Sequence, residues 1–540
     1  MERAPQRPDG VLNAVILTLG VGGAAILLLT LAPPPGSLDD VFVVLTEARR
    51  SLGALGEDAW NPAPVDSCTS PADVLLKMAL LLGANGQDPL RASGWLALLE
   101  VALFVAVSVR LLSSRVRDLR LRAVCAVGLV GTPGLLESAT YRLEGPIFAV
   151  LWMLTVAAAM DRAPRRAVAW GAALAWVRPE GMLLGLAASW LAAGPGLARP
   201  GRHRAWAALL VVVPVSAYRL MRFGDWLPNT YRAKRSDDLV QEWMDGSSYA
   251  VELLFSPGGL ALVLLAVVVG RGARVGRGAV TAELAGRCSV ALALTGLALA
   301  VMVASGGDSY AGARLALPMG IPLWLGLASA HGRVGPRVAV GAAAALLQAA
   351  LLVGTGPAEP PVVERLKGAL GGPAGLEVFE AEERALEAAS IALGDEVLAH
   401  RHLQRVRWFC PEMRVMDLTG LTDREVAALP APGQVTFGRD AVGLALERRV
   451  GALHLDPVGV RPAPLSSAAL VAALSDPRIA AQFAGPPYLT RELAEGLDRT
   501  YLGASYPVPG GHVNLLVRED LAERFQAAGF TVSSPAPGRR

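Results

Sequence analysis

Charged residues are scarce in this chain. Only 18% of its 540 residues are Asp, Glu, Lys or Arg, against 53% hydrophobic residues, and lysine occurs only at Lys77, Lys234 and Lys367. Soluble domains carry about a quarter charged residues, so this composition excludes an ordinary soluble protein and indicates a polytopic membrane protein. The net charge is only +3, without the basic stripe typical of nucleic-acid binding, so nucleic acid is not an expected partner.

Cysteine is also rare, and the positions of the four cysteines exclude the paired spacing of a zinc site. They are Cys68, Cys125, Cys288 and Cys410. A cleavable signal is not expected either, because no small-residue cleavage site stands out beside the long first apolar run. We therefore expect that run, Val11–Ala32, to be retained as the first membrane span.

Long apolar runs recur along the first two thirds of the chain. The run at Pro71–Leu82 is short and contains Lys77, so we expect it to lie at the membrane interface rather than to cross. Arg165–Val177 and Gly181–Ala193 are short for full spans. We expect about eleven membrane helices in total. They are Val11–Ala32, the two short segments Arg165–Val177 and Gly181–Ala193, and Leu90–Leu112, Leu119–Leu136, Leu143–Met160, Ala205–Met221, Tyr249–Gly270, Cys288–Ser305, Arg314–Ala330 and Val338–Thr355.

The arginines predict the orientation of these spans. With the N-terminus in the cytoplasm, every short cytoplasmic loop is basic, as the positive-inside rule requires of an inner-membrane protein. Letting Pro71–Leu82 cross would place the later basic loops outside, which again favours an interfacial segment.

The chain changes character near Gly356. The segment Gly354–Pro361 is rich in Gly and Pro and is typical of a linker. We expect residues 1–355 to form a transmembrane domain. We expect residues 356–540 to form a soluble α/β domain, because short apolar runs alternate there with helical segments. An odd number of spans places this domain outside the cytoplasm. Cys68 and Cys410 then share an oxidising compartment, which leaves a disulfide between them open.

The same orientation gathers unusual polar residues on the outer face. The first is the acid pair Asp39-Asp40, followed by an amphipathic stretch, Val41–Arg50, that can lie along the membrane. Each polar segment also has an ordinary structural explanation: a helix cap at Asp39-Asp40, a dipole-stabilised acid at Glu144, a helix break with an internal ion pair, or a turn. The remaining polar residues of this face are Arg178, Glu180, Asp225, Asn229 and Asp308. Their convergence on one side favours a site.

These residues fall in segments that together resemble a known family. Asp39–Phe42, Ala48-Arg49, Asn61-Pro62 and Thr69–Pro71 resemble the first outer loop of the GT-C membrane glycosyltransferases, in the branch that contains the mycobacterial terminal arabinofuranosyltransferases. The resemblance continues through Glu144–Pro146, Arg178–Gly181, Gly224–Thr230, Gly306–Asp308 and Asp417–Asp423. It implies a GT-C-like helical fold and transfer of a sugar, arabinofuranose in that branch, from a polyprenyl-phosphate donor to an acceptor glycan of the cell envelope.

The resemblance also implies roles for the outer-face residues. A carboxylate within reach of the acceptor hydroxyl can act as general base, and we assign this role to Asp39 or Asp40, without choosing between them. Arginine suits the donor phosphate, so Arg178 is the first candidate to bind it, followed by Arg232, Lys234 and Arg314. We expect Glu144, Glu180, Asp225, Asn229 and Asp308 to bind substrate. Dependence on a divalent cation and the stereochemistry of transfer stay open.

Two other classes of protein stay in view. A transporter or flippase of lipid-linked sugars would place polar residues at mid-membrane and show an internal repeat. A non-catalytic assembly factor, of the kind linked to flagellar poles, would tolerate loss of Asp39 and Asp40. The soluble domain is expected either to bind the acceptor or to cap the site.

Overall fold

The computed structural model describes most of the helical region and the core of a C-terminal sheet. The described residues are 38–53, 66, 68–83, 89–132, 134–140, 142–193, 200–234, 239–274, 279–306, 317–330, 334–353, 374–400, 406, 410, 412–418, 426, 429, 441–454, 460–461, 464, 497, 500–509 and 511–533. The predicted first span, the linker and the domain boundary at residue 355 lie outside these residues.

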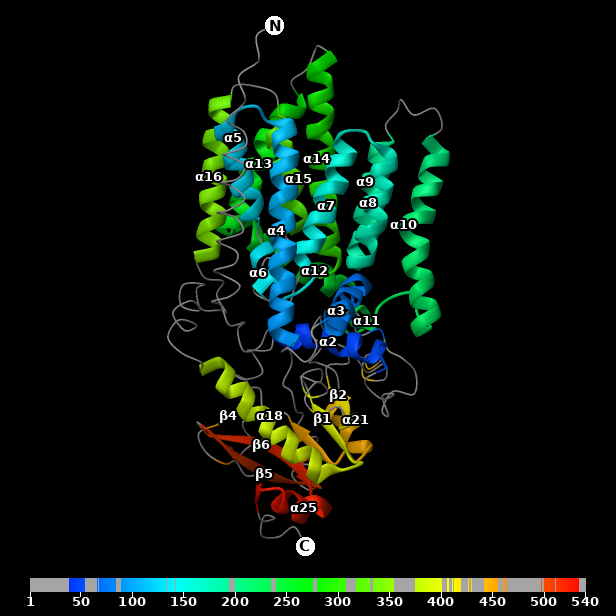
Figure 1. Cartoon of the computed structure of the whole chain (residues 1–540), viewed down its shortest axis with the longest axis vertical. Coiled ribbons are helices and arrows are strands. Elements are labelled where there is room, and N and C mark those ends of the chain that lie inside the picture. The colour runs from blue at the N-terminus through cyan, green and yellow to red at the C-terminus, as the bar shows by residue number, and fades with distance from the viewer. Residues whose placement is uncertain are drawn as a thin grey trace.

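A helical bundle forms the larger part of the molecule, and a small α/β unit lies beyond one end of it (Figure 1). The bundle consists of α4 (Pro89–Arg115), α5 (Leu119–Val130), α6 (Leu135–Thr140), α7 (Gly145–Met160), α8 (Pro164–Val177), α9 (Pro179–Ala192), α10 (Pro200–Phe223), α13 (Pro257–Arg274), α14 (Ala279–Ala304), α15 (Leu317–Ser329) and α16 (Val334–Val353). Helices α7 and α15 are the most buried of these, and the indole of Trp152 donates to the Pro318 carbonyl oxygen between them (2.8 Å).

Four described helices are long and apolar enough to cross a bilayer. They cover Ala92–Arg115, Pro200–Phe223, Pro257–Arg274 and Ala282–Ala304, and α7 and α15 are shorter apolar helices. The described residues thus agree with a helical membrane protein joined to an α/β unit. The total of about eleven spans stays a prediction.

Two expected spans are each divided between two helices. In the run Leu119–Leu136, α5 ends at Val130 and α6 starts at Leu135. The run Tyr249–Gly270 was predicted to cross as a single helix, but α12 (Leu239–Phe255) ends before Pro257 and α13 starts there. Proline favours the first position of a helix, and the Ser256 hydroxyl accepts a hydrogen bond from the Gly259 N–H (3.1 Å), which caps the new helix. A side chain at Gly259 would meet the Leu253 carbonyl oxygen, so the corner requires glycine there.

Helices α2 (Leu38–Ser51), α3 (Pro71–Gly83) and α11 (Asn229–Lys234) lie at the end of the bundle that faces the α/β unit (Figure 1). Helix α3 is not among the described helices long and apolar enough to cross a bilayer, and its interfacial place stays a prediction. Helix α2 differs from the expectation, because Val41–Ala48 are all buried and leave no wet face. Val43 and Val44 pack with Val74 of α3, which explains the burial.

The α/β unit contains a mixed sheet whose strand order is β2-β1-β3-β6-β5-β7, with β4 paired to β6. Its elements are α18 (Ala374–Leu393), β1 (Val397–His400), β2 (Arg414–Asp417), α21 (Ala441–Glu447), β3 (Ala452–His454), β4 (Val460–Arg461), β5 (Tyr501–Val508), β6 (Gly511–Arg518), α25 (Ala522–Ala527) and β7 (Thr531–Val532). Strands β2, β1 and β3 are parallel, and the remaining pairs are antiparallel. The predicted α/β character is therefore present in this part of the chain.

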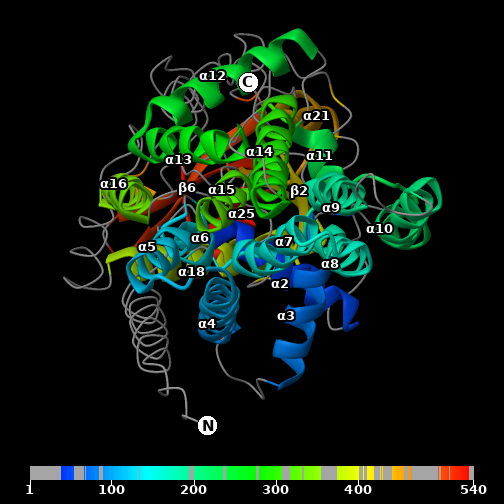
Figure 2. The same cartoon turned by 90° about the horizontal axis from the view of Figure 1, so that it is seen from above.

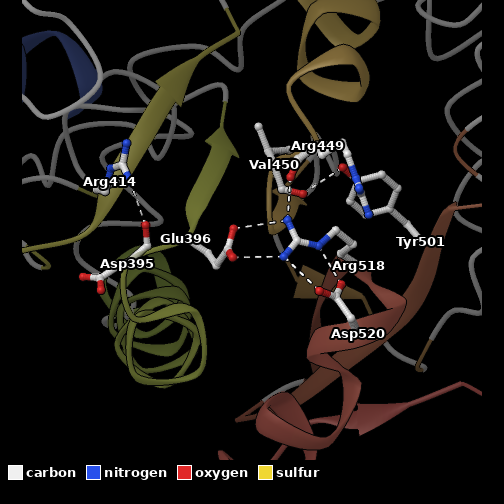
Figure 3. Close-up of polar contacts among 8 residues, drawn as sticks. All are labelled: Asp395, Glu396, Arg414, Arg449, Val450, Tyr501, Arg518 and Asp520. Atoms are coloured by element: carbon white, nitrogen blue, oxygen red, sulfur yellow. Dashed lines mark hydrogen bonds and ion pairs between the residues drawn. The ribbon is translucent and has the colours of Figure 1, made fainter.

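Arg518 joins the two halves of this sheet (Figure 3). Its guanidinium donates to both carboxylate oxygens of Glu396 (3.0 and 3.2 Å), to Asp520 (2.6 and 3.0 Å) and to the Arg449 carbonyl oxygen (2.6 Å). Glu396 precedes the parallel strand β1, whereas Arg518 ends the antiparallel strand β6. These charge-assisted hydrogen bonds hold the starts of β1 and β3 to β6.

Candidate functional site

The acid pair Asp39-Asp40 lies in the first turn of α2, which begins at Leu38. Both acids are inside the helix and not at its N-cap, and acids in the first turn are favoured by the helix dipole. This position does not conflict with a catalytic role. The side chains of both residues lie outside the described part of the structure. The two roles therefore stay predictions, and the surroundings of α2 carry the structural argument.

The loop between α2 and α3 is fastened to α10 and α11. Arg219 of α10 is fully buried, its Nε lies 3.1 Å from the Asp66 carboxylate, and it donates to the Thr69 carbonyl oxygen (2.9 Å). The Asn229 N–H, at the start of α11, donates to the Asp66 carbonyl oxygen (2.9 Å). Asn229, predicted as a substrate-binding residue, thus holds this loop through its backbone.

Asp66 is an acid in an unusual environment. Burial raises its pKa from 3.8 to about 7, and the nearby carboxylate of Glu47 on α2 raises it too, although Arg219 and the Cys68 N–H oppose both effects. Burial disfavours the charged form more than the single ion pair favours it. A carboxyl group with such a pKa can exchange a proton near neutral pH.

A second group of charges surrounds Lys77 of α3. Its Nζ donates to the Arg142 carbonyl oxygen (3.2 Å) and lies 3.7 Å from Asp73, and both side chains are almost completely buried. Burial raises the pKa of Asp73 to about 6, while Lys77 opposes this shift. Glu100 of α4 is also buried and interacts with Asp73, Lys77 and Glu144. These residues link α3 and α4 to the start of α7.

Arg178 lies between two of the predicted substrate-binding acids. Its Nε is 2.7 Å from Glu180 and 3.6 Å from Glu144, and its guanidinium lies 5.6 Å from the centre of the Phe148 ring. Arg178 has an extended backbone between α8 and α9, because Pro179 begins the second helix. The predicted helix break and internal ion pair are both confirmed, and Glu144 has the predicted place at the start of α7.

Asp225 and Arg232 form a separate pair beside α11. Their closest oxygen and nitrogen atoms are 2.6 Å apart, and the Arg232 side chain is 55% exposed. Asp225 also accepts a hydrogen bond from the Leu227 N–H (3.3 Å), which is the predicted turn. The side chain of Lys234, and all of Asp308 and Arg314, lie outside the described residues.

The structure thus brings together Glu144, Arg178 and Glu180, and pairs Asp225 with Arg232. It adds residues that the sequence analysis did not single out, namely Asp66, Asp73, Glu100 and Arg219. Glu100 and Arg219 are ionisable residues inside otherwise apolar helices. Such residues are a reason to expect a functional role, so the sequence did contain a signal for these two. Asp66, in a polar loop, gave no such signal.

The cysteine arrangement corrects one open expectation. All four cysteines are free thiols, so Cys68 and Cys410 do not form a disulfide. Cys68 packs with residues of α2 and α3, whereas Cys410 lies in the core of the α/β unit, so the two are buried in separate clusters. Within the described residues, no group of three or more His, Cys, Asp or Glu side chains is arranged to hold a metal ion.

Comparison with known proteins adds no further identification. No protein-family model, curated protein or solved structure matches this chain. The resemblance to the GT-C glycosyltransferases therefore remains a resemblance carried by short motifs.

Proposed function

We propose that the chain is a membrane glycosyltransferase that uses a polyprenyl-phosphate sugar as donor. The observation that carries the proposal is the packing of the α2–α3 loop onto α10 and α11. Cys68 of this loop also interacts electrostatically with Glu144, which pairs with Arg178. Carboxylates, the buried Arg219 and the partly buried Arg178 are thereby proposed to share one end of an apolar bundle, where a lipid-linked substrate meets water. A purely structural bundle has no need to bury this many charges, which are costly unless paired.

In the proposed reaction, the oxygen of an acceptor hydroxyl attacks the anomeric carbon of the donor sugar. A carboxylate of Asp39 or Asp40 takes the hydroxyl proton, the bond from the anomeric carbon to the phosphate oxygen breaks, and polyprenyl phosphate leaves. Arg178 is proposed to neutralise the leaving phosphate, with Arg232, Lys234 and Arg314 as further candidates. Because Arg178 already contacts two carboxylates, the phosphate must displace one of them or approach from another side of the guanidinium.

We propose arabinofuranose as the sugar and an envelope glycan as the acceptor, on the outer face of the inner membrane. The choice of this sugar and this acceptor is based on the motif resemblance alone. The α/β unit then belongs to the acceptor side of the enzyme, either binding the glycan or covering the site.

The test is transfer by the purified full-length protein in detergent, from a synthetic prenyl-phosphoryl arabinofuranose to an oligosaccharide. Asp39→Asn and Asp40→Asn are compared with the control variant Glu283→Gln. Glu283 is an exposed acid near the start of α14. We expect transfer to be lost in at least one aspartate variant and kept in Glu283→Gln, with all variants eluting as folded protein. The absence of transfer by the wild-type protein with every member of a panel of prenyl-phosphate sugars would contradict the proposal. Full activity in both aspartate variants would mean that Asp39 and Asp40 only stabilise the start of α2.

A further inference from the structure

Helix α12 differs from its neighbours in direction. Figure 2, which looks along the long axis of the molecule, shows α4, α10 and α16 end-on, whereas α12 extends across the view at the edge of the bundle. Helix α12 has 17 residues and joins α13 at the sharp corner formed by Ser256 and Pro257. It is not among the described helices able to cross a bilayer, whereas α13 is.

One side of α12 packs closely against the bundle. Glu242, Gly246, Ala250 and Leu253 are buried, at intervals of three or four residues that place them on one face. A Cβ atom on Gly246 would lie only 2.0 Å from the carbonyl oxygen of Val303 in α14. The two helix backbones are therefore in direct contact at this point, and α12 is held in its crosswise position.

A second side of α12 is apolar and exposed. Its residues are Val240, Trp243, Met244, Val251 and Phe255, with exposed fractions from 53% to 79%. At about 100° per residue, they lie on one arc of the helix, in which the exposed Ser247 is the polar residue. We call these five residues the apolar stripe of α12.

A third side of α12 is polar. Gln241, Asp245, Ser248 and Glu252 follow the apolar stripe around the helix, and Gln241 donates to Asp245 (2.7 Å). The helix thus has one protein-facing, one apolar and one polar side. This is the pattern of a helix that lies in the plane of a membrane interface, where a tryptophan is also favoured.

Exposed apolar side chains follow the apolar stripe on the next helix, α13. At the corner after Phe255, the exposed side chains Leu260, Val263, Leu264 and Val267 extend along α13. Because α13 is long and apolar enough to cross a bilayer, its exposed apolar side chains meet acyl chains. The stripe of α12 meets this surface at the corner between Phe255 and Pro257.

We propose that α12 is an in-plane membrane helix whose apolar stripe inserts between lipid headgroups and acyl chains. It lies in the leaflet at the end of the bundle that carries α2, α3 and α11. The polar side, with Glu252, faces water. This assignment is independent of the reaction proposed above. An in-plane helix at this position would determine how deeply the polar end of the bundle sits in the bilayer.

The test uses neighbouring residues that point in different directions. Val251→Cys places a nitroxide label on the apolar stripe, and Glu252→Cys places the same label on the polar side, about 100° away around the helix. The full-length protein is labelled in lipid nanodiscs, with wild-type protein as the labelling control, since its four cysteines are buried. Collision of the label with oxygen and with a water-soluble nickel chelate is then measured.

We expect the label at position 251 to collide several-fold more with oxygen than with the nickel chelate, and the label at 252 to show the reverse. Strong collision of both labels with the nickel chelate would mean that the stripe faces water, and overturns the proposal. Shielding of position 251 from both reagents overturns it in favour of a protein partner or a second copy. Oxygen-only collision at both positions means that the whole helix is submerged, which also contradicts an in-plane position.

Discussion

Lys77 lies one helical turn after Asp73, with its Nζ 3.7 Å from the carboxylate and both side chains almost fully buried. The lysine also donates to the Arg142 carbonyl oxygen, so it connects α3 to the segment that leads into α7. Arg142 has a positive φ of 58°, a conformation that non-glycine residues seldom adopt without support from their surroundings. The buried pair is one such support.

We predict that Lys77→Met destabilises the protein, because it leaves the Asp73 charge buried without its cation. Breaking one side of a buried pair costs about 3–5 kcal/mol. Thermal unfolding in detergent measures the loss, and the double variant Lys77→Met with Asp73→Leu should recover much of it. A double variant as unstable as the single one would show that the charge is not the cause.

Asp66 predicts a dependence of stability on pH. Its pKa in the folded protein, about 7, lies above the ordinary value of 3.8, so the folded state holds a proton that the unfolded state has lost between these values. The free energy of unfolding therefore falls as the pH rises from about 4 to about 7, on the order of 1 kcal/mol per pH unit for this group. Asp66→Asn should flatten this part of the profile. An unchanged slope would mean that Asp66 does not contribute it.

Arg178 predicts a specific kinetic effect if it binds the donor phosphate. Arg178→Gln should lower kcat/KM for the donor by about 10²-fold, the size seen when one preorganised charge-stabilising group is removed. Arg178→Lys should recover only part of the activity, because lysine lacks the planar fork. The comparison variant is Arg232→Gln, because Arg232 is a further candidate for the phosphate and is exposed and paired with Asp225. Equal losses in both variants, with an unchanged KM for the acceptor, would remove the preference for Arg178.

We predict that Arg518 stabilises the α/β unit. Arg518→Ala removes every hydrogen bond to Glu396, Asp520 and the Arg449 carbonyl oxygen, so we expect a loss of about 2–3 kcal/mol. Arg518→Lys should retain part of this contribution. Hydrogen exchange of β1, β3 and β6 measures the change locally, and slow exchange in these strands of Arg518→Ala would contradict it.

Much of the helical arrangement follows from the sequence, because apolar length and proline positions determine where helices end. Pro179 ends α8 and starts α9 as expected. Pro257 likewise starts a new helix. Because the residues on both sides of it are apolar, the sequence predicted a single span there and not the corner between α12 and α13. Serine and glycine beside that proline complete the turn.

The candidate site was less predictable, because its connections join residues far apart in the chain. Arg178 and Glu180 are sequence neighbours, and their ion pair was foreseen. The contact of Arg219 with Asp66 was not, since no local pattern relates an arginine near the end of α10 to an acid in a polar loop. The polar segments are thus visible in the sequence, whereas the contacts between them depend on the fold.

That contact also has a consequence for the order in which the chain is built. Arg219 donates to Thr69, a residue 150 positions earlier. At about 5–20 residues per second, synthesis of the intervening chain takes roughly 8–30 s. During that interval the loop after α2 lacks the partner that fixes it. The newly made protein therefore completes its polar end only after α10 has been inserted, which makes this end a late step of assembly.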